Sequence, residues 1–140
     1  MLLEYSDVLT MIPQKPPMVM VDGLVKNDEK STTSRLVLNQ QNIFCKNGYF
    51  HEPGLIENIA QTAALRAGFA AHQNKNKSET GFIGAVKKLK IYDLPKDSGI
   101  LQTNITVLTE IANATIIKGE VFVGSTLMAE GEMSIFKQEL

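Results

Sequence analysis

The chain has 140 residues, a formal net charge of −1 and a 44% share of hydrophobic residues. This length fits one domain, so we expect a single domain over residues 1–140. The near-neutral charge predicts no nucleic-acid partner, because such partners require a strongly basic surface.

The sequence also predicts a cytoplasmic protein without membrane insertion. Its first seven residues include Glu4 and Asp7 and no basic side chain, unlike a signal peptide. No apolar run approaches the roughly 18 residues of a membrane-spanning helix. Cys45 is the only cysteine, which excludes an internal disulfide and a zinc site of several cysteines and suits a reducing compartment.

The first third of the chain predicts a short helix and a hairpin. Residues 5–11 can form a helix capped by Ser6 or Asp7, and the prolines that follow favour an extended chain. Residues 18–26 and 31–38 have strand character and flank a polar turn at residues 27–30. This arrangement is typical of a hairpin.

A long helix is expected from Pro53 onward. Among residues 59–71 only Gln61, Thr62 and Arg66 are polar, so the helix is apolar nearly all round and is predicted to be buried on most sides. Its apolar side chains are mostly alanine. Such small side chains let other backbones come close from several directions, which favours a helix embraced by a curved sheet.

Strands are predicted for the rest of the chain. Residues 81–92, 100–111 and 115–123 have strand patterns, and Gly124-Ser125 is a two-residue loop that favours a type II′ hairpin into a last strand. That last strand places Ala129 and Met133 on one face and glutamates on the other. The order of elements predicts an α+β fold, with a curved antiparallel sheet wrapped around one long central helix.

The start of the long helix carries the residues with chemical potential. A helix N-terminus has free N–H groups and a partial positive charge, and Gly54 lets a ligand carbonyl approach its N–H closely. His51 can exchange a proton near neutral pH, and Glu57 and Gln61 share one helix face. An acid, a base and an oxyanion donor around one point suit proton removal beside a carbonyl.

Simpler interpretations stand beside this one. His51 can be an exposed loop histidine. Glu57 can be an acid of the first turn that only interacts favourably with the helix dipole. Gln61 can be a hydrogen-bond partner for a backbone group. The three lysines of the strand after the helix are either a solvated strand face or a docking patch for an acidic partner; they are Lys87, Lys88 and Lys90.

Four stretches of the chain resemble the 3-hydroxyacyl-[acyl-carrier-protein] dehydratases of the hotdog fold. They are residues 12–22, residues 48–61 with the pattern GYFHEPGLIENIAQ, the FIG triplet at residues 82–84 with Pro95 and Gly99, and the closing hairpin from Gly119 to Phe136. The resemblance covers nearly the whole chain.

The resemblance implies a hotdog fold, and it implies removal of water from a 3-hydroxyacyl thioester to give a trans-2-enoyl thioester, in fatty-acid or polyene-type lipid biosynthesis. It implies a homodimer or higher even oligomer, an acyl tunnel between subunits and a thioester of acyl carrier protein or coenzyme A as substrate, with no cofactor and no metal. His51 and Glu57 would be the catalytic pair, contributed by different subunits. The implied substrate-binding residues are Tyr49, Gly54, Asn58, Gln61, Phe82 and Gly84.

The sequence departs from that family at two positions. Tyr49 stands where the family has its catalytic histidine, with His51 two residues later, and Gln14 replaces an early histidine. Two other functions therefore remain open. One is a hotdog thioesterase, in which Glu57, Asn58 and Gln61 position water. The other is a non-catalytic acyl-binding subunit of a dehydratase complex.

Overall fold

The computed structural model describes residues 1–75 and 81–137 of the chain. Its elements in chain order are α1 (Tyr5–Met11), β1 (Gly23–Asn27), β2 (Ser31–Val37), β3 (Cys45–Lys46), β4 (Tyr49–Phe50), α2 (Glu52–Gln73), β5 (Gly81–Ile91), β6 (Ile100–Ile111), β7 (Ala114–Val123) and β8 (Thr126–Lys137). Within the described ranges, neither helix has the length and apolar character of a membrane span.

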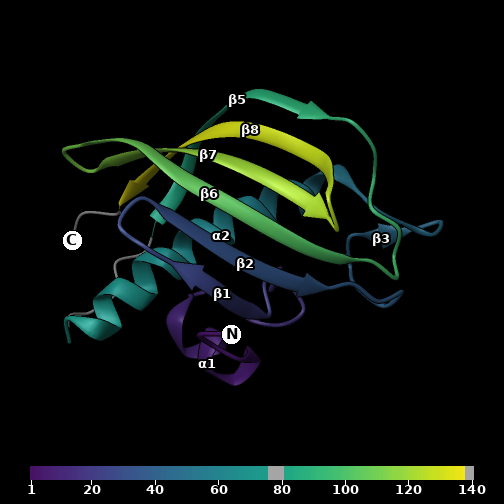
Figure 1. The fold of residues 1–140 in the computed structure, drawn as a ribbon, viewed down its shortest axis with the longest axis horizontal. Coiled ribbons are helices and arrows are strands. Elements are labelled where there is room, and N and C mark those ends of the chain that lie inside the picture. The colour runs from purple at the N-terminus through teal and green to yellow at the C-terminus, as the bar shows by residue number, and fades with distance from the viewer. Residues whose placement is uncertain (76–80, 138–140) are drawn as a thin grey trace.

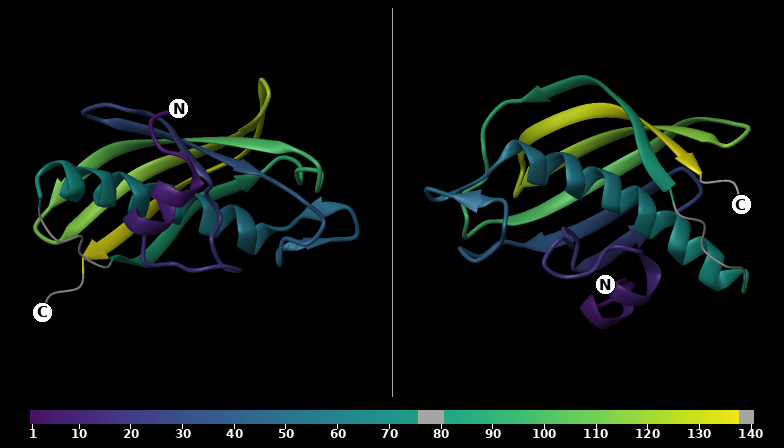
Figure 2. Two further views of the ribbon diagram at one scale, coloured as in Figure 1. Left: turned by 90° about the horizontal axis from the view of Figure 1, so that it is seen from below. Right: turned by 180° about the vertical axis from the view of Figure 1, so that it is seen from behind.

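Six strands form one antiparallel sheet in the order β1-β2-β6-β7-β8-β5, and β3 pairs with β4 beside it. The sheet curves, and α2 lies along its concave side (Figures 1 and 2). The predicted α+β hotdog architecture, a curved sheet around one long helix, is therefore confirmed.

The main core lies between α2 and the concave face of the sheet. Leu55 and Ile59 of α2 are fully buried there, and the expected alternation of β8 holds because Ala129 and Met133 are buried on the same side. Gly119 of β7 allows the close approach, since a Cβ at this position would lie 2.5 Å from Cγ2 of Ile59. The sheet adds mainly the apolar side chains of Leu36, Leu101, Ile105, Ile117 and Val121.

The helix α1 covers the opposite side of α2. A Cβ on Gly68 would collide with the carbonyl oxygen of Met11, so this glycine lets the end of α1 rest on α2. The predicted extent of α1 is confirmed, but its predicted cap is wrong. The N-cap residue is Glu4, which makes no side-chain capping hydrogen bond; Ser6 and Asp7 both lie inside the helix.

The strand predicted over residues 18–26 begins only at Gly23. Around Met20 the backbone is hydrogen-bonded to side chains of α2, and contact with β2 starts only at Asp22, whose N–H donates to the carbonyl of Arg35 at 2.8 Å. The N–H of Met20 donates to Oε1 of Gln61 at 2.6 Å, and its carbonyl accepts from Nδ2 of Asn58 at 2.8 Å. Side chains on α2 therefore replace a strand ladder at this place.

The other predicted boundaries differ by a few residues at most. Helix α2 runs through Gln73, so the polar segment expected to end it at residue 72 begins inside the helix, and residues 76–80 of that segment lie outside the described residues. The loop between β7 and β8 is confirmed at Gly124-Ser125, where Gly124 has a φ of 58°, as the first position of a type II′ turn requires.

Candidate active site

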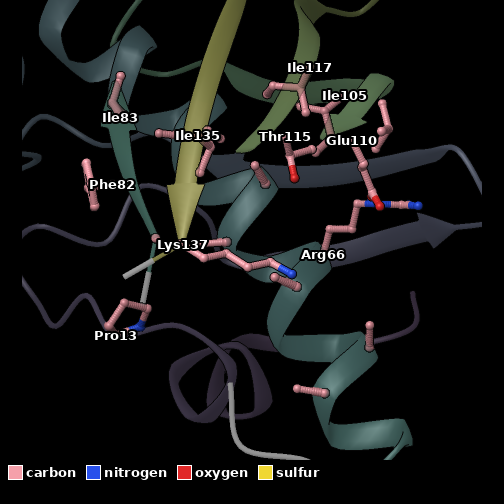
Figure 3. A pocket seen from close by; sticks show the side chains of 18 of the residues that line it. Pro13, Arg66, Phe82, Ile83, Ile105, Glu110, Thr115, Ile117, Ile135 and Lys137 are labelled. Carbon is pink, nitrogen blue, oxygen red and sulfur yellow. The ribbon is translucent and has the colours of Figure 1, made fainter. Parts of the chain in front are cut away.

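A cavity of about 870 Å³ lies between α2, from Glu57 onward, and the concave face of the sheet (Figure 3). Its helix side is made mostly of alanines: Ala60, Ala63, Ala64, Ala67, Ala70 and Ala71. Its sheet side is made of branched apolar side chains: Ile83, Ile105, Val107, Ile117 and Ile135. We call this space the groove. Its walls suit a long apolar ligand.

Polar groups lie mainly toward the two ends of the groove. Glu57 stands at the end nearer the start of α2. Arg66, Glu110 and Lys137 stand toward the other end (Figure 3). From Glu57 to Ala71 the helix rises about 21 Å, which is the approximate length of the groove.

The carboxylate of Glu57 is held by a buried neighbour. Nε2 of Gln61 donates to Oε2 of Glu57 at 2.9 Å and also to the carbonyl of Met18 at 2.9 Å. Because Oε1 of Gln61 already accepts from Met20, all polar atoms of this fully buried side chain are engaged. Gln61 therefore orients Glu57 and does not itself reach the groove, where we had expected it to bind substrate.

Asn58 likewise serves the fold. It is fully buried, donates to the carbonyl of Met20, and accepts from the hydroxyl of Thr103 at 2.5 Å. Thr103 lies on β6, so Asn58 links the helix to both the sheet and the segment before β1. This position does not match the predicted contact of Asn58 with substrate.

His51 stands at the N-cap of α2, outside the lining of the groove. Its Nε2 lies 2.9 Å from the carbonyl oxygen of Lys46 and its Nδ1 lies 3.6 Å from Oε1 of Glu52. Since a carbonyl only accepts, Nε2 carries a proton. Glu57 lies six positions after His51 along the helix, a rise of about 9 Å. One protomer therefore does not bring the two predicted catalytic groups together.

The glycine at the start of the helix is fully enclosed. The N–H of Gly54 donates to the carbonyl of His51 at 2.9 Å, and a Cβ there would collide with the ring of Phe50. In this protomer the N–H predicted to hold an oxyanion is thus used in the first turn of the helix. Tyr49 lies on β4, is 42% exposed, and pairs with Lys46 on one side and Lys96 on the other.

Of the predicted site residues, the groove brings together Glu57 and Phe82. Phe82 is 56% exposed and stacks on Phe136 with ring centroids 5.9 Å apart. Gly84 lies beside this pair, because a Cβ there would enter the ring of Phe136. It makes room for the aromatic stack and does not line the groove itself.

Arg66 and Gln14 are among the residues of the groove that were not predicted as site residues. Arg66 was visible in the sequence as the single charge within residues 59–71. Its Nη1 donates to the carbonyl of Asp28 at 2.8 Å and to Oγ1 of Thr32 at 3.0 Å, so it ties α2 to the β1–β2 turn. Gln14, noted only as a departure from the family pattern, also lines the groove.

The lysines of β5 lie opposite glutamates of β8. Lys88 forms an ion pair with Glu132 at 3.3 Å, and Lys90 is in register with Glu130. Glu130 also accepts a hydrogen bond of 2.6 Å from the hydroxyl of Tyr92, which lowers the pKa of this carboxyl group. The charges are balanced across the strands, which favours a solvated strand face over an acidic partner's docking patch.

The residues that the structure describes form no metal site and include no reactive thiol. Within residues 1–75 and 81–137, no three side chains of the metal-binding types come together. Burial raises the pKa of the Cys45 thiol, so at neutral pH this cysteine is protonated and a poor nucleophile.

Comparison with known proteins gives a consistent result. Residues 6–139 match the ApeP-like family, described as ApeP dehydratase. The 3-hydroxyacyl-[acyl-carrier-protein] dehydratase FabZ of Chlamydia trachomatis is 26% identical over 142 residues, which cover 94% of this chain and 90% of that protein. FabZ of Clostridium kluyveri is also 26% identical, and the match covers 91% of each chain.

A solved structure has the same fold. It is the dehydratase heterocomplex ApeI:P from Xenorhabdus doucetiae, which superimposes with a TM-score of 0.84 over 94% of this chain and 91% of that chain, at 14% sequence identity. At this identity the likeness establishes the fold alone.

Proposed function

Because the chain belongs to the ApeP-like family of dehydratases, we propose that it removes water from a 3-hydroxyacyl thioester to form a trans-2-enoyl thioester. The single observation that carries the choice of substrate is the groove, an apolar channel with the oriented carboxyl group of Glu57 at one end. The FabZ relatives are named for thioesters of acyl carrier protein, so we propose that carrier first and coenzyme A second.

In this reaction a base removes a proton from C2 and the C2–C3 double bond forms. The bond from C3 to its hydroxyl oxygen breaks at the same time, and the hydroxyl leaves as water after taking a proton from an acid. We assign the acid to Glu57 and the base to His51 of a second protomer. Nε2 of His51 donates to Lys46, so the neutral ring keeps its lone pair on Nδ1, the nitrogen that would accept the C2 proton.

Support for a second protomer comes from the two edges of the sheet. The β1 edge is covered, because Leu2 and Leu3 hydrogen-bond to the backbone of Leu24. The β5 edge has no covering segment among the described residues, and Figure 1 shows β5 along the outer rim of the sheet. Free strand edges pair readily with other strands.

The two halves of β5 differ as pairing surfaces. Residues 81–86 are apolar, whereas residues 87–90 hold three lysines, which hinder edge pairing; each half of the strand contains a register shift. We propose that a second hotdog chain pairs with residues 81–86. That chain is either another copy, giving a homodimer or higher even oligomer, or a related subunit, as in the ApeI:P heterocomplex.

The catalytic proposal is tested by following enoyl absorbance with purified protein and a 3-hydroxyacyl thioester. We expect Glu57→Gln and His51→Ala each to lower kcat/KM by a factor of about 100 or more, the usual size of a general acid–base contribution. The matched control is His72→Ala, which changes an exposed histidine in the last turn of α2 and should leave the rate unchanged.

Other outcomes separate the remaining functions. Release of free thiol without enoyl product would indicate a thioesterase and contradict the dehydratase. Turnover only in the presence of a second subunit, with full rate in the His51→Ala variant, would indicate a non-catalytic acyl-binding subunit. Activity in His51→Ala homodimers would remove His51 from the mechanism.

The edge proposal is tested by the mass of the protein in solution. A charge at Val86, which is 36% exposed on β5, should weaken pairing. We expect Val86→Lys to shift the assembly toward monomer in sedimentation experiments, whereas Leu108→Lys, at an exposed position of β6 away from this edge, should not. A wild-type monomer at micromolar concentration, alone and with a related subunit, would contradict the proposal.

A further inference from the structure

The tip of the small β3–β4 hairpin carries an Asn-Gly pair. Asn47 and Gly48 form a two-residue turn with φ values of 55° and 87°, the positive angles that a type I′ turn requires. Both residues are exposed, and a Cβ on Gly48 would meet no atom within 4 Å. Among the described residues, neither the side-chain amide of Asn47 nor the N–H of Gly48 makes a hydrogen bond.

These two unbonded groups are the reactants of a spontaneous change that makes asparagine one of the labile residues of proteins. The nitrogen of Gly48 loses its proton to a base and attacks Cγ of Asn47. A five-membered succinimide ring closes, and the side-chain nitrogen leaves as ammonia. Water then opens the ring at either carbonyl and gives aspartate or isoaspartate. Glycine at the second position favours ring closure, because it has no Cβ to obstruct the attack.

Two other places in the chain share part of this arrangement. Asp22 also precedes a glycine, but its Oδ1 accepts from Nε of Arg35 and its Oδ2 from the N–H of Val37, both at 2.7 Å, and only 18% of its side chain is exposed. Asn113 also lies in a two-residue hairpin turn, between β6 and β7, but alanine follows it. Asn47 combines the glycine, the exposure and the unbonded amide.

The closed turn fixes the backbone of this pair, so ring closure requires the hairpin to open. Strands β3 and β4 have two residues each, and so short a hairpin has little stability of its own. The N–H of Asp97 donates to the carbonyl of Gly48 at 3.0 Å and holds the turn from outside. Because local openings cost less free energy than global unfolding, we expect conversion in the folded protein at a lower rate than in the unfolded chain.

The same hairpin holds the ring of His51. Nε2 of His51 lies 2.9 Å from the carbonyl oxygen of Lys46, which belongs to the peptide bond between Lys46 and Asn47. Isoaspartate continues the chain through its side-chain carboxyl carbon and thereby adds one carbon to the backbone of the turn. The pairing of Lys46 with Tyr49 requires a turn of two ordinary residues, so the added carbon displaces the carbonyl that holds His51. Aspartate adds a charge but keeps the ordinary backbone.

We propose that Asn47 is a site of spontaneous deamidation, and that its isoaspartate product releases His51 from the carbonyl of Lys46. The first part of this inference is independent of the proposed function. The second part rests on it only where a catalytic rate is measured.

The first measurement follows the folded wild-type protein over days in mildly alkaline buffer. Incubation in heavy-oxygen water labels every product that forms in the folded protein, whereas products of the later digestion in ordinary water stay unlabelled. We expect mass spectrometry to show labelled acid in place of the amide of Asn47. Methylation by a protein isoaspartate methyltransferase should detect the isoaspartate. Peptides that contain Asp22 and Asn113 should stay unchanged.

Variants and the two histidines of the chain locate the effect. Asn47→Gln keeps an amide but cannot close a five-membered ring, and its hairpin should stay intact. Asn113→Gln makes the same change in the other turn and should leave conversion at Asn47 as in the wild type. In NMR spectra the ring signals of His51 are compared with those of His72. We expect a second set of His51 signals that grows with the isoaspartate content, and unchanged signals of His72.

Separate results would overturn each part. An Asn47 that stays intact in the folded protein, but converts in the chain unfolded by guanidinium, would contradict the modification site. Equal conversion at Asn113 would show that the Asn-Gly turn does not select the residue. Isoaspartate at position 47 with unchanged His51 signals would contradict the release of His51.

Failure of the dehydratase proposal is recognised separately. Where fresh protein turns over a 3-hydroxyacyl thioester, we expect the rate to fall with the isoaspartate fraction, and a constant rate would contradict the second part. Fresh protein without any turnover would contradict the dehydratase and leave the mass and NMR results to decide this inference. Thermal melting verifies that each variant and the converted protein are folded.

Discussion

The two halves of α2 differ in their side chains and in what these side chains contact. In the first half, Leu55, Asn58 and Ile59 are fully buried, and polar side chains reach out to the sheet and to the segment before β1. In the second half, five alanines line the groove: Ala63, Ala64, Ala67, Ala70 and Ala71. One half anchors the helix and the other half leaves space beside it.

This difference teaches how a helix surrounded by a sheet can still border a channel. Close packing throughout would leave no room for a ligand, because protein interiors are normally filled. Here the hydrogen bonds of the first half fix the helix against the sheet, and Arg66 ties its middle to the β1–β2 turn. The second half is thereby held in place without large side chains filling the space.

The largest expected effect comes from removing hydrogen bonds made by the first half of α2. Asn58→Leu removes the donor to the carbonyl of Met20 and the acceptor for the hydroxyl of Thr103, and it leaves both groups buried. We expect the free energy of unfolding to fall by about 2–4 kcal/mol, the sum of two unsatisfied buried groups. Guanidinium unfolding measures this change.

The matched control for this variant is Asn104→Leu. Asn104 lies on β6 with its side chain on the outer face, where it accepts a hydrogen bond of 2.7 Å from Thr33. Because water can replace that bond, we expect a loss below about 1 kcal/mol. An equal loss of unfolding free energy in both variants would mean that the buried hydrogen bonds of Asn58 stabilise the fold no more than an exposed one does.

The next largest effect is expected in the second half of α2, beside the groove. It concerns the binding of substrate and not the stability of the fold. Ala67→Leu places a larger side chain on the groove wall of a helix that tolerates leucine well. The melting temperature should change little, but kcat/KM for long acyl thioesters should fall about tenfold or more, as when a hydrophobic pocket loses space for a methylene group or two. Short acyl thioesters should react at nearly the wild-type rate, and an equal loss for every chain length would contradict the groove.

Much of this fold follows from patterns in the sequence. The alternation in β6 and β8 and the apolar character of α2 predicted the antiparallel sheet and the central helix. The extent of β1 was not predictable, because it depends on the amides of Asn58 and Gln61, which bind the backbone of the preceding segment. A contact between residues about 40 positions apart leaves no local pattern.

The site was predictable only in part, for a related reason. Glu57 and Phe82 do reach the groove. The small residues of the helix were expected to permit close packing, and this is confirmed at Gly68, whereas the alanines border the groove. Composition shows that side chains are small but not whether the space beside them is filled. The roles assigned to His51 need a second protomer, whose position one sequence does not specify.

A smaller effect is expected at the boundary between the two halves. Arg66→Met removes the hydrogen bonds to the β1–β2 turn and keeps an unbranched side chain of similar length. Because the guanidinium group is partly exposed and water reaches the freed carbonyls, we expect a loss of only about 1 kcal/mol in unfolding free energy. Hydrogen exchange should accelerate in residues 27–32 and not in β7. Unchanged exchange in the turn would show that Arg66 does not hold it.

The smallest effect concerns pH and the same turn. Backbone N–H groups of Lys30 and Ser31 and the hydroxyl of Ser31 donate to the carboxylate of Asp28, and together they lower its pKa. A lowered pKa in the folded chain means that the carboxylate stabilises the fold fully above the pKa of the unfolded chain. This contribution disappears as the pH falls through the lower pKa of the folded chain, a window that begins near pH 4. Asp28 is exposed, so the effect is small.

We expect Asp28→Ala to lose less stability than the wild type between pH 5 and pH 3, as read from unfolding midpoints. Parallel curves for the two proteins would mean that the stability of the turn does not depend on this carboxylate.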